Sequence, residues 1–221
     1  MRVSMKVVLG LIMALFMGGI VFAEGDNKYY SEFAFKHKLN DQFDVFFTPE
    51  FRYKDDMGNF YYYHMRVGST FHAHKNLDLA LAYRFIQNKA DGEWDNNNIQ
   101  YIEMIAVPKI TLGGFDISDA NKIERRYYQN APNRWVYRNL LRFAYPAKIG
   151  GFAFTPYVSN EVYYDFELNK ANLDWITLGA TKKISDYLTL GVYYRAELSR
   201  VGSSNKWVTN QVLGTNVSVN F

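Results

Sequence analysis

The sequence predicts an all-β fold, an antiparallel up-and-down transmembrane β-barrel of about 10 to 12 strands. Three observations support this prediction. Segments near the length of a tilted membrane strand alternate between apolar and polar residues with period two. The connections between these segments alternate between short and long. The last segment is amphipathic and ends on an aromatic residue, Phe221.

The composition is that of one folded domain rich in aromatic residues. The 221 residues include 18 Tyr and 17 Phe, which favour strands and suit the boundary between lipid and water. There is no cysteine, which excludes disulfides, thiolate metal sites and thiol nucleophiles. The positive residues are interleaved with Asp and Glu, so the chain lacks the coherent basic face that nucleic-acid binding requires.

Residues 1–23 have the layout of a cleaved signal peptide. Arg2 and Lys6 form a basic start, an apolar run follows from residue 7 to 22, and Ala23 supplies the small residue before the cleavage point. The alternative is a single membrane anchor, for which this run is short. We therefore expect cleavage after Ala23 and a barrel over 24–221, whose net charge falls from +3 to about +1.

The polarity of the segment that begins at Leu188 is the clearest. Leu190, Val192 and Leu198 lie on one face, while Arg195 and Glu197 lie on the other. One face suits lipid and the other suits water, and the same split recurs along the chain. We expect strands at 28–38, 43–54, 60–74, 77–87, 99–111, 115–128, 135–145, 152–164, 174–184, 187–199 and 207–221.

The number of these segments is odd, whereas bacterial single-chain barrels usually have an even number of strands. Either segment 28–38 lies outside the ladder, leaving ten strands, or two strands have been merged and the count is twelve. We favour ten. The partner that closes the ring against segment 207–221 is then either 28–38 or 43–54.

The final segment places Leu213, Val217 and Phe221 on its apolar face. A closing strand that ends on an aromatic residue resembles the signal by which outer-membrane barrels are recognised for assembly. This resemblance implies two partners, the lipid of the outer membrane and the barrel-assembly machinery, which would bind through the strand ending in Phe221. The alternative is an edge strand of a secreted β-sandwich.

Three motifs carry a further resemblance. They are KIERRYY at 122–128, WVYRNLLRF at 135–143, and Ser159-Asn160-Glu161. Together with the closing strand they resemble a family of bacterial outer-membrane proteins that is known only as a domain of unknown function. The resemblance spans most of the mature chain and implies a porin-like barrel in the outer membrane of a Gram-negative bacterium. It implies no activity and no catalytic residues.

The polar faces of the strands would fill the lumen with charges of both signs. Such a set most often forms ion pairs that fill a small barrel, because a charge excluded from water needs a partner. A narrow polar pore is the second interpretation and catalysis the third. The candidate lumen-lining residues are Glu50, Arg52, Arg66, Arg84, Glu103, Glu124, Arg126, Arg138, Arg142, Glu161, Arg195 and Glu197.

Catalytic and metal sites have weaker support. His64, His72 and His74 share the inward face of one predicted strand, but zinc needs three or four ligands from nearby groups. Ser69 falls on the lipid face, and no histidine neighbours Ser159. Pairing of Glu161 with an arginine of the adjacent strand, Arg138 or Arg142, explains the 159–161 motif more simply. We therefore expect no catalytic residue, metal or cofactor.

The sequence thus predicts an integral outer-membrane barrel with a structural or narrow-pore role. The competing hypothesis is an outer-membrane enzyme acting on lipid or lipopolysaccharide. The tyrosine clusters near the predicted strand ends are expected to form girdles at the membrane interface. The sequence predicts no oligomeric state.

Overall fold

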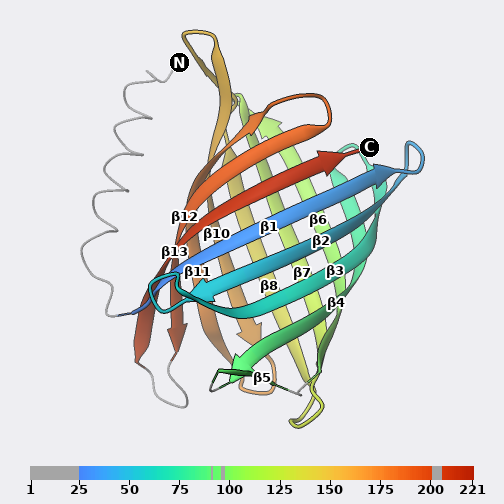
Figure 1. Ribbon diagram of the computed structural model, residues 1–221. Coiled ribbons are helices and arrows are strands. Elements are labelled where there is room, and N and C mark those ends of the chain that lie inside the picture. Colours follow the sequence, from blue (N-terminus) through green and yellow to red (C-terminus); the bar gives the residue numbers. More distant parts are fainter. Residues whose placement is uncertain (1–24, 91, 96–97, 201–205) are drawn as a thin grey trace.

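The computed structural model is a closed β-barrel with obliquely inclined strands (Figure 1), and it describes residues 25–90, 92–95, 98–200 and 206–221. The predicted signal peptide lies outside these residues. Eleven long strands form the wall, and the short strands β5 (Glu93–Trp94) and β9 (Ala147–Ile149) pair with β4 and β10. The long strands are β1 (Asn27–Lys38), β2 (Phe43–Lys54), β3 (Asn59–His74), β4 (Leu77–Ala90), β6 (Ile99–Leu112), β7 (Phe115–Tyr127), β8 (Arg134–Ala144), β10 (Phe152–Asp165), β11 (Lys170–Lys183), β12 (Leu188–Arg200) and β13 (Trp207–Asn220).

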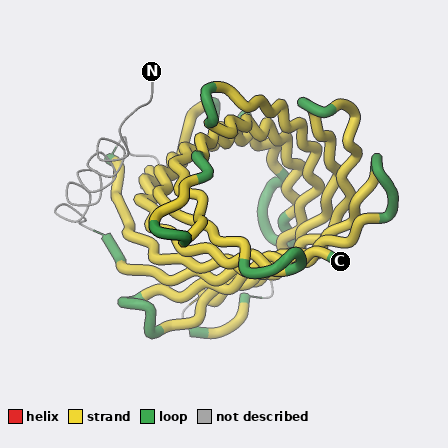
Figure 2. The backbone as a smooth tube through the Cα atoms, turned by 90° about the horizontal axis from the view of Figure 1, so that it is seen from above, coloured by secondary structure: helices red, strands yellow, loops and turns green. Residues whose placement is uncertain are grey.

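The ring closes between the first and the last strand, and Figure 2 shows it from above. All other neighbouring long strands are antiparallel, but β1 and β13 are parallel, with Phe33 opposite Val217. The predicted barrel is confirmed, but the expectation of an even count was wrong. With an odd number of strands one neighbouring pair must be parallel, and only the chain's two ends lack a connecting hairpin that forces them antiparallel.

The closing pair also fixes where the chain ends lie. β1 begins at the rim that carries the long connections and runs to the rim of the short turns, where β13 ends beside it. There the backbone N–H of Phe221 donates to the carbonyl of Lys36 at 2.9 Å, and that of Lys38 donates to the carbonyl of Phe221 at 3.3 Å. Segment 28–38 is therefore part of the wall and contributes its polar face to the lumen.

The distribution of apolar residues is the reverse of that in a water-soluble protein. Leu81 and Val192 on the outer face are 56% and 58% exposed, whereas Glu103 and Glu124 inside have no exposed surface. A continuous apolar outer face of this kind suits contact with lipid chains. Within the described residues no helix is long and apolar enough to cross a membrane.

Two glycines let aromatic rings lie flat on the inner wall. A Cβ added to Gly179 would come within 2.6 Å of the Tyr157 ring, and one added to Gly214 within 2.1 Å of the Tyr193 ring. Tyr193 packs there against buried Tyr30. The glycines thus make room for side chains that narrow the lumen.

Aromatic residues also mark the rim of the long connections on the outer face. Each of three tryptophans holds a cation near its ring: Lys89 at 5.0 Å from Trp94, Arg125 at 5.1 Å from Trp135 and Arg200 at 5.0 Å from Trp207. Tryptophan is typical of the membrane–water interface. The predicted tyrosine girdles are less complete, because one ring of some clusters, such as Tyr163, points inward and is buried.

The opposite rim carries charged turns. Lys38 forms an ion pair with Asp41, and Lys183 forms one with Asp186. In each pair the distance between Nζ and Oδ1 is 2.7 Å. The hydrogen bonds from these lysines lower the pKa of both turn carboxyls, which therefore stay ionised at neutral pH. Such charged turns belong in water, so the apolar band ends before them.

A cysteine pair tests the parallel closure, because the natural chain has no cysteine. Phe33 and Val217 are partners across the seam, so we expect F33C/V217C to form a disulfide on oxidation. Crosslinking is read as altered migration of the unfolded chain in a gel. The control F33C/L213C places the second cysteine opposite Tyr29 instead and should stay reduced. Equal crosslinking in both variants would contradict the register.

Candidate functional site

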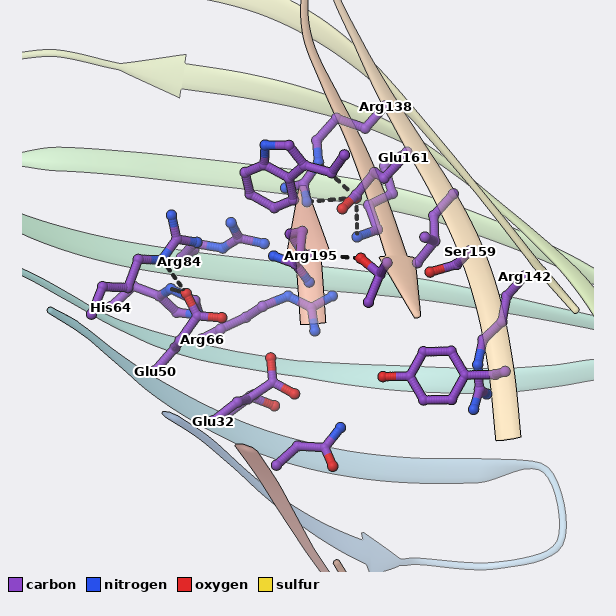
Figure 3. Close-up of a pocket in the computed structure, with 18 of the residues that line it drawn as sticks. Glu32, Glu50, His64, Arg66, Arg84, Arg138, Arg142, Ser159, Glu161 and Arg195 are labelled. Atoms are coloured by element: carbon purple, nitrogen blue, oxygen red, sulfur yellow. Dashed lines mark hydrogen bonds and ion pairs between the residues drawn. The ribbon is translucent and has the colours of Figure 1, made fainter. Parts of the chain in front are cut away.

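The lumen contains a polar cavity of about 380 Å³ (Figure 3). Side chains reach into it from strands around the wall, mostly from the middle of each strand and from its short-turn half. Seven of the lining side chains are basic and three are glutamates, namely Arg52, Arg66, Arg84, Lys122, Arg138, Arg142 and Arg195, with Glu32, Glu50 and Glu161.

A first cluster of ion pairs is centred on the fully buried Glu103. Arg66 on β3 donates from Nε to its Oε2 at 2.9 Å, and Nη2 of Arg84 on β4 lies 2.5 Å from its Oε1. Glu103 belongs to β6, so the cluster spans three successive strands of the wall. Two guanidinium groups thereby compensate one carboxylate that has no access to water.

A second cluster is centred on Arg138 of β8. Its guanidinium group lies 2.6 Å from Glu124 on β7 and 2.6 Å from Glu161 on β10, so one cation joins two buried carboxylates. Glu124 also pairs with Arg126, and Glu161 lies 3.5 Å from Lys122. The ion pairs therefore continue around the wall from β7 to β10.

Arg52 forms a contact that crosses the lumen. Its guanidinium group pairs with Glu50 and lies over the rings of Tyr30 on β1 at 4.4 Å, Tyr62 on β3 at 4.3 Å and Trp175 on β11 at 5.6 Å. These positions lie toward the long-connection ends of their strands. Cation–π contacts of this kind hold the rings around the cation. We call Arg52, Tyr30, Tyr62 and Trp175 the lumen constriction.

Every charged residue that was predicted to line the lumen occupies a position whose side chain points inward from its strand. The pairing of Glu161 with Arg138 is confirmed, whereas Arg142 instead lies over the Tyr157 ring at 4.3 Å. The predicted binding role of the eleven residues stays a prediction. They are Glu50, Arg52, Arg66, Arg84, Glu124, Arg126, Arg138, Arg142, Glu161, Arg195 and Glu197.

Other lumen residues were missed by the sequence prediction. Lys28 pairs with Glu197 at 3.2 Å, and Glu32 lines the cavity, but both belong to the segment expected outside the ladder. Lys122 lies two residues before Glu124 on the same strand, so both side chains point to the same face. This alternation could have identified Lys122 as a lumen residue.

The histidines form no common site. His64 lies in the lumen, with Nδ1 3.0 Å from the Tyr62 hydroxyl. His72 is held near the short-turn rim by Asp44 and Asp78 at 2.8 and 2.7 Å. A register shift after His72 places His74 opposite Leu77, so the expectation that these two histidines share a face was wrong. The described residues contain no group of three or more His, Cys, Asp or Glu that could hold a metal ion.

Removal of Arg138 should destabilise the barrel strongly. R138L would leave Glu124 and Glu161 each with one cation fewer in a buried setting, so we expect a loss of about 3–5 kcal/mol in the free energy of unfolding. Urea titration in detergent micelles measures this. R142L is the matched control, because Arg142 has no carboxylate partner among the described residues, and its effect should be clearly smaller. Equal losses would mean that the ion pairs do not determine stability.

Comparison with solved structures relates the fold to outer-membrane barrels. LpxR from Salmonella typhimurium is similar with a TM-score of 0.60 and 10% sequence identity, over 97% of this chain and 96% of that one. An anion-selective porin from Comamonas acidovorans gives a TM-score of 0.39 with 14% identity, over 80% of this chain and 57% of that one.

No curated protein matches the sequence. One family model matches residues 27–208, which includes almost the entire barrel wall and all the ion pairs described above. Its description is "Protein of unknown function (DUF2490)". The chain belongs to this family.

Proposed function

We propose that the protein is an integral barrel of the outer membrane of a Gram-negative bacterium, and that its lumen is a narrow polar passage for water and small ions. The apolar outer face supports the membrane location, since the exposed side chains there are those that lipid favours. The polar cavity supports the passage, because fixed charges on its wall would hold water and not lipid.

The single observation that carries this proposal is the cavity together with the lumen constriction. A volume of about 380 Å³ corresponds to roughly 13 water molecules at about 30 Å³ each. The ring contacts around Arg52 then narrow the lumen toward the long-connection rim. The lumen constriction, and not the cavity, would then limit which solutes pass, and it would favour small hydrated ions over bulky solutes.

The same proposal includes how the chain reaches the membrane. We propose export by the signal peptide at 1–23, followed by assembly through the closing strand that ends in Phe221. The outward side chains of that strand, such as Leu213, support contact with lipid. With the short turns in the periplasm, the long connections and the start of β1 would face the outside.

Bilayer recordings test the passage. We expect small discrete conductance steps from the purified barrel in planar bilayers. R52A removes the cation that holds the constriction together, so its steps should be several-fold larger. R125Q is the control, because Arg125 lies on the outer face over Trp135, and its conductance should equal that of the natural protein.

Absence of steps in both the natural protein and R52A, with folding shown by heat-modifiable migration, would contradict the passage. The competing hypothesis of an enzyme acting on lipid or lipopolysaccharide predicts a different result. It requires turnover of such a substrate by the purified protein and its loss in H64A, because His64 is the histidine that lines the cavity.

A further inference from the structure

One row of residues across four adjacent strands gives the cavity a distinct wall. In the strand register Arg142 on β8 lies opposite Ser159 on β10, Ser159 opposite Thr177 on β11, and Thr177 opposite Arg195 on β12. Directly opposed residues point to the same side of a sheet, and all four line the cavity. Along this row two hydroxyl-bearing residues therefore stand between two arginines. We call these four residues the oxyanion row.

Both arginines of the oxyanion row lack a carboxylate partner. Among the described residues, neither Arg142 nor Arg195 has an acidic group within ion-pair distance, unlike Arg52, Arg66, Arg84 and Arg138, which have one or two each. Glu32 is the cavity-lining carboxylate left without an ion pair in the same set. One such carboxylate against two guanidinium groups leaves excess positive charge on this side of the cavity, and this excess favours binding of an anion.

This wall presents several hydrogen-bond donors. Arg195 donates from Nε to Oγ1 of Thr177 at 3.0 Å, so the hydroxyl hydrogen of Thr177 remains free to point elsewhere. The Nε1–H of Trp175, a buried side chain that also lines the cavity, has no acceptor among the described residues. Buried donors normally have acceptors, so this set is complementary to a ligand that only accepts.

Aromatic rings hold the two arginines in place. The guanidinium group of Arg142 lies 4.3 Å from the Tyr157 ring, and that of Arg195 lies 4.5 Å from Trp175 and 4.9 Å from Tyr193. Tyr157 and Tyr193 are themselves positioned against glycines of the neighbouring strands. Less side-chain entropy is therefore lost when these arginines bind a ligand.

We propose that the oxyanion row, with Trp175, is a binding site for a small free oxyanion of the phosphate or sulfate class. A planar guanidinium group donates two parallel hydrogen bonds to such an ion, and the two hydroxyls add further donors. The cavity has room for one such ion with its water. This proposal depends on the proposed passage in one respect, which is that the ion must be able to reach the lumen.

Titration of the purified barrel in detergent with inorganic phosphate, followed by calorimetry, tests this site. We expect saturable binding by the natural protein and an affinity about tenfold or more weaker in R142Q and in R195Q, because each loses charge-assisted hydrogen bonds. R142K/R195K keeps the charge and should retain part of the binding. R125Q is the matched control, since it removes one positive charge from the outer face.

Absence of saturable binding by the natural protein would overturn the proposal, as would equal affinity in R125Q and R195Q. Heat-modifiable migration identifies variants that fail to fold, and T177V then serves as a second probe that removes one donor without changing the charge. A parallel titration with phosphatidic acid distinguishes the source of the oxyanion. Competition between this lipid and phosphate would place the site at the membrane surface and contradict a lumen site.

The calorimetric result is independent of the bilayer recordings. Phosphate binding without conductance would leave the oxyanion site standing and reject the passage. Conductance without phosphate binding would support the passage and reject the oxyanion site. If both hold, addition of phosphate should reduce the chloride current through the natural protein more than through R142Q/R195Q.

Discussion

The interior of this barrel is organised by the need to compensate carboxylates that have no access to water. Glu103 and Glu124 are completely buried, and each is paired with two guanidinium groups: Glu103 with Arg66 and Arg84 of the preceding strands, and Glu124 with Arg126 of its own strand and Arg138 of the next. Isolated charges in such a place would be strongly unfavourable, so the positions of these arginines follow from those of the glutamates. Arg138 then links the second cluster to Glu161. The cavity is the space that these ion pairs leave open, and among the described residues Arg142 and Arg195 are its arginines with no carboxylate within ion-pair distance.

Much of the wall could be predicted from sequence because side chains alternate between the two faces of a strand. In this barrel the outward face is apolar and the inward face is polar. The strand limits agree with the structure to within a few residues, and the outward positions of Val192 and Leu213 are as expected. The contact of Arg52 with Trp175 could not be predicted, since it joins strands far apart in sequence and depends on the width of the ring. Glu32 was missed for a different reason. The alternation of polarity does not show in which direction the first strand runs beside the last, so segment 28–38 was expected outside the ladder.

Similarity to LpxR at 10% identity extends over nearly the full length of both chains, and at that level it establishes the fold alone. The function has to be argued from the lumen. Its two notable parts differ in chemistry: the constriction is one cation enclosed by three aromatic rings, while the oxyanion row presents two cations and two hydroxyls. Trp175 and Arg195 belong to neighbouring strands and touch each other, so occupancy of the row and the width of the constriction would be coupled.

The parallel seam has a topological consequence for the whole chain. Because β1 and β13 run side by side in the same direction, Asn27 and Phe221 lie at opposite rims. A short linker therefore has no route between the two ends, and circular permutation would require a segment long enough to run from one rim of the barrel to the other. The same geometry makes the two ends independent attachment points. A peptide fused before β1 would emerge at one rim of the barrel and a peptide fused after β13 at the other.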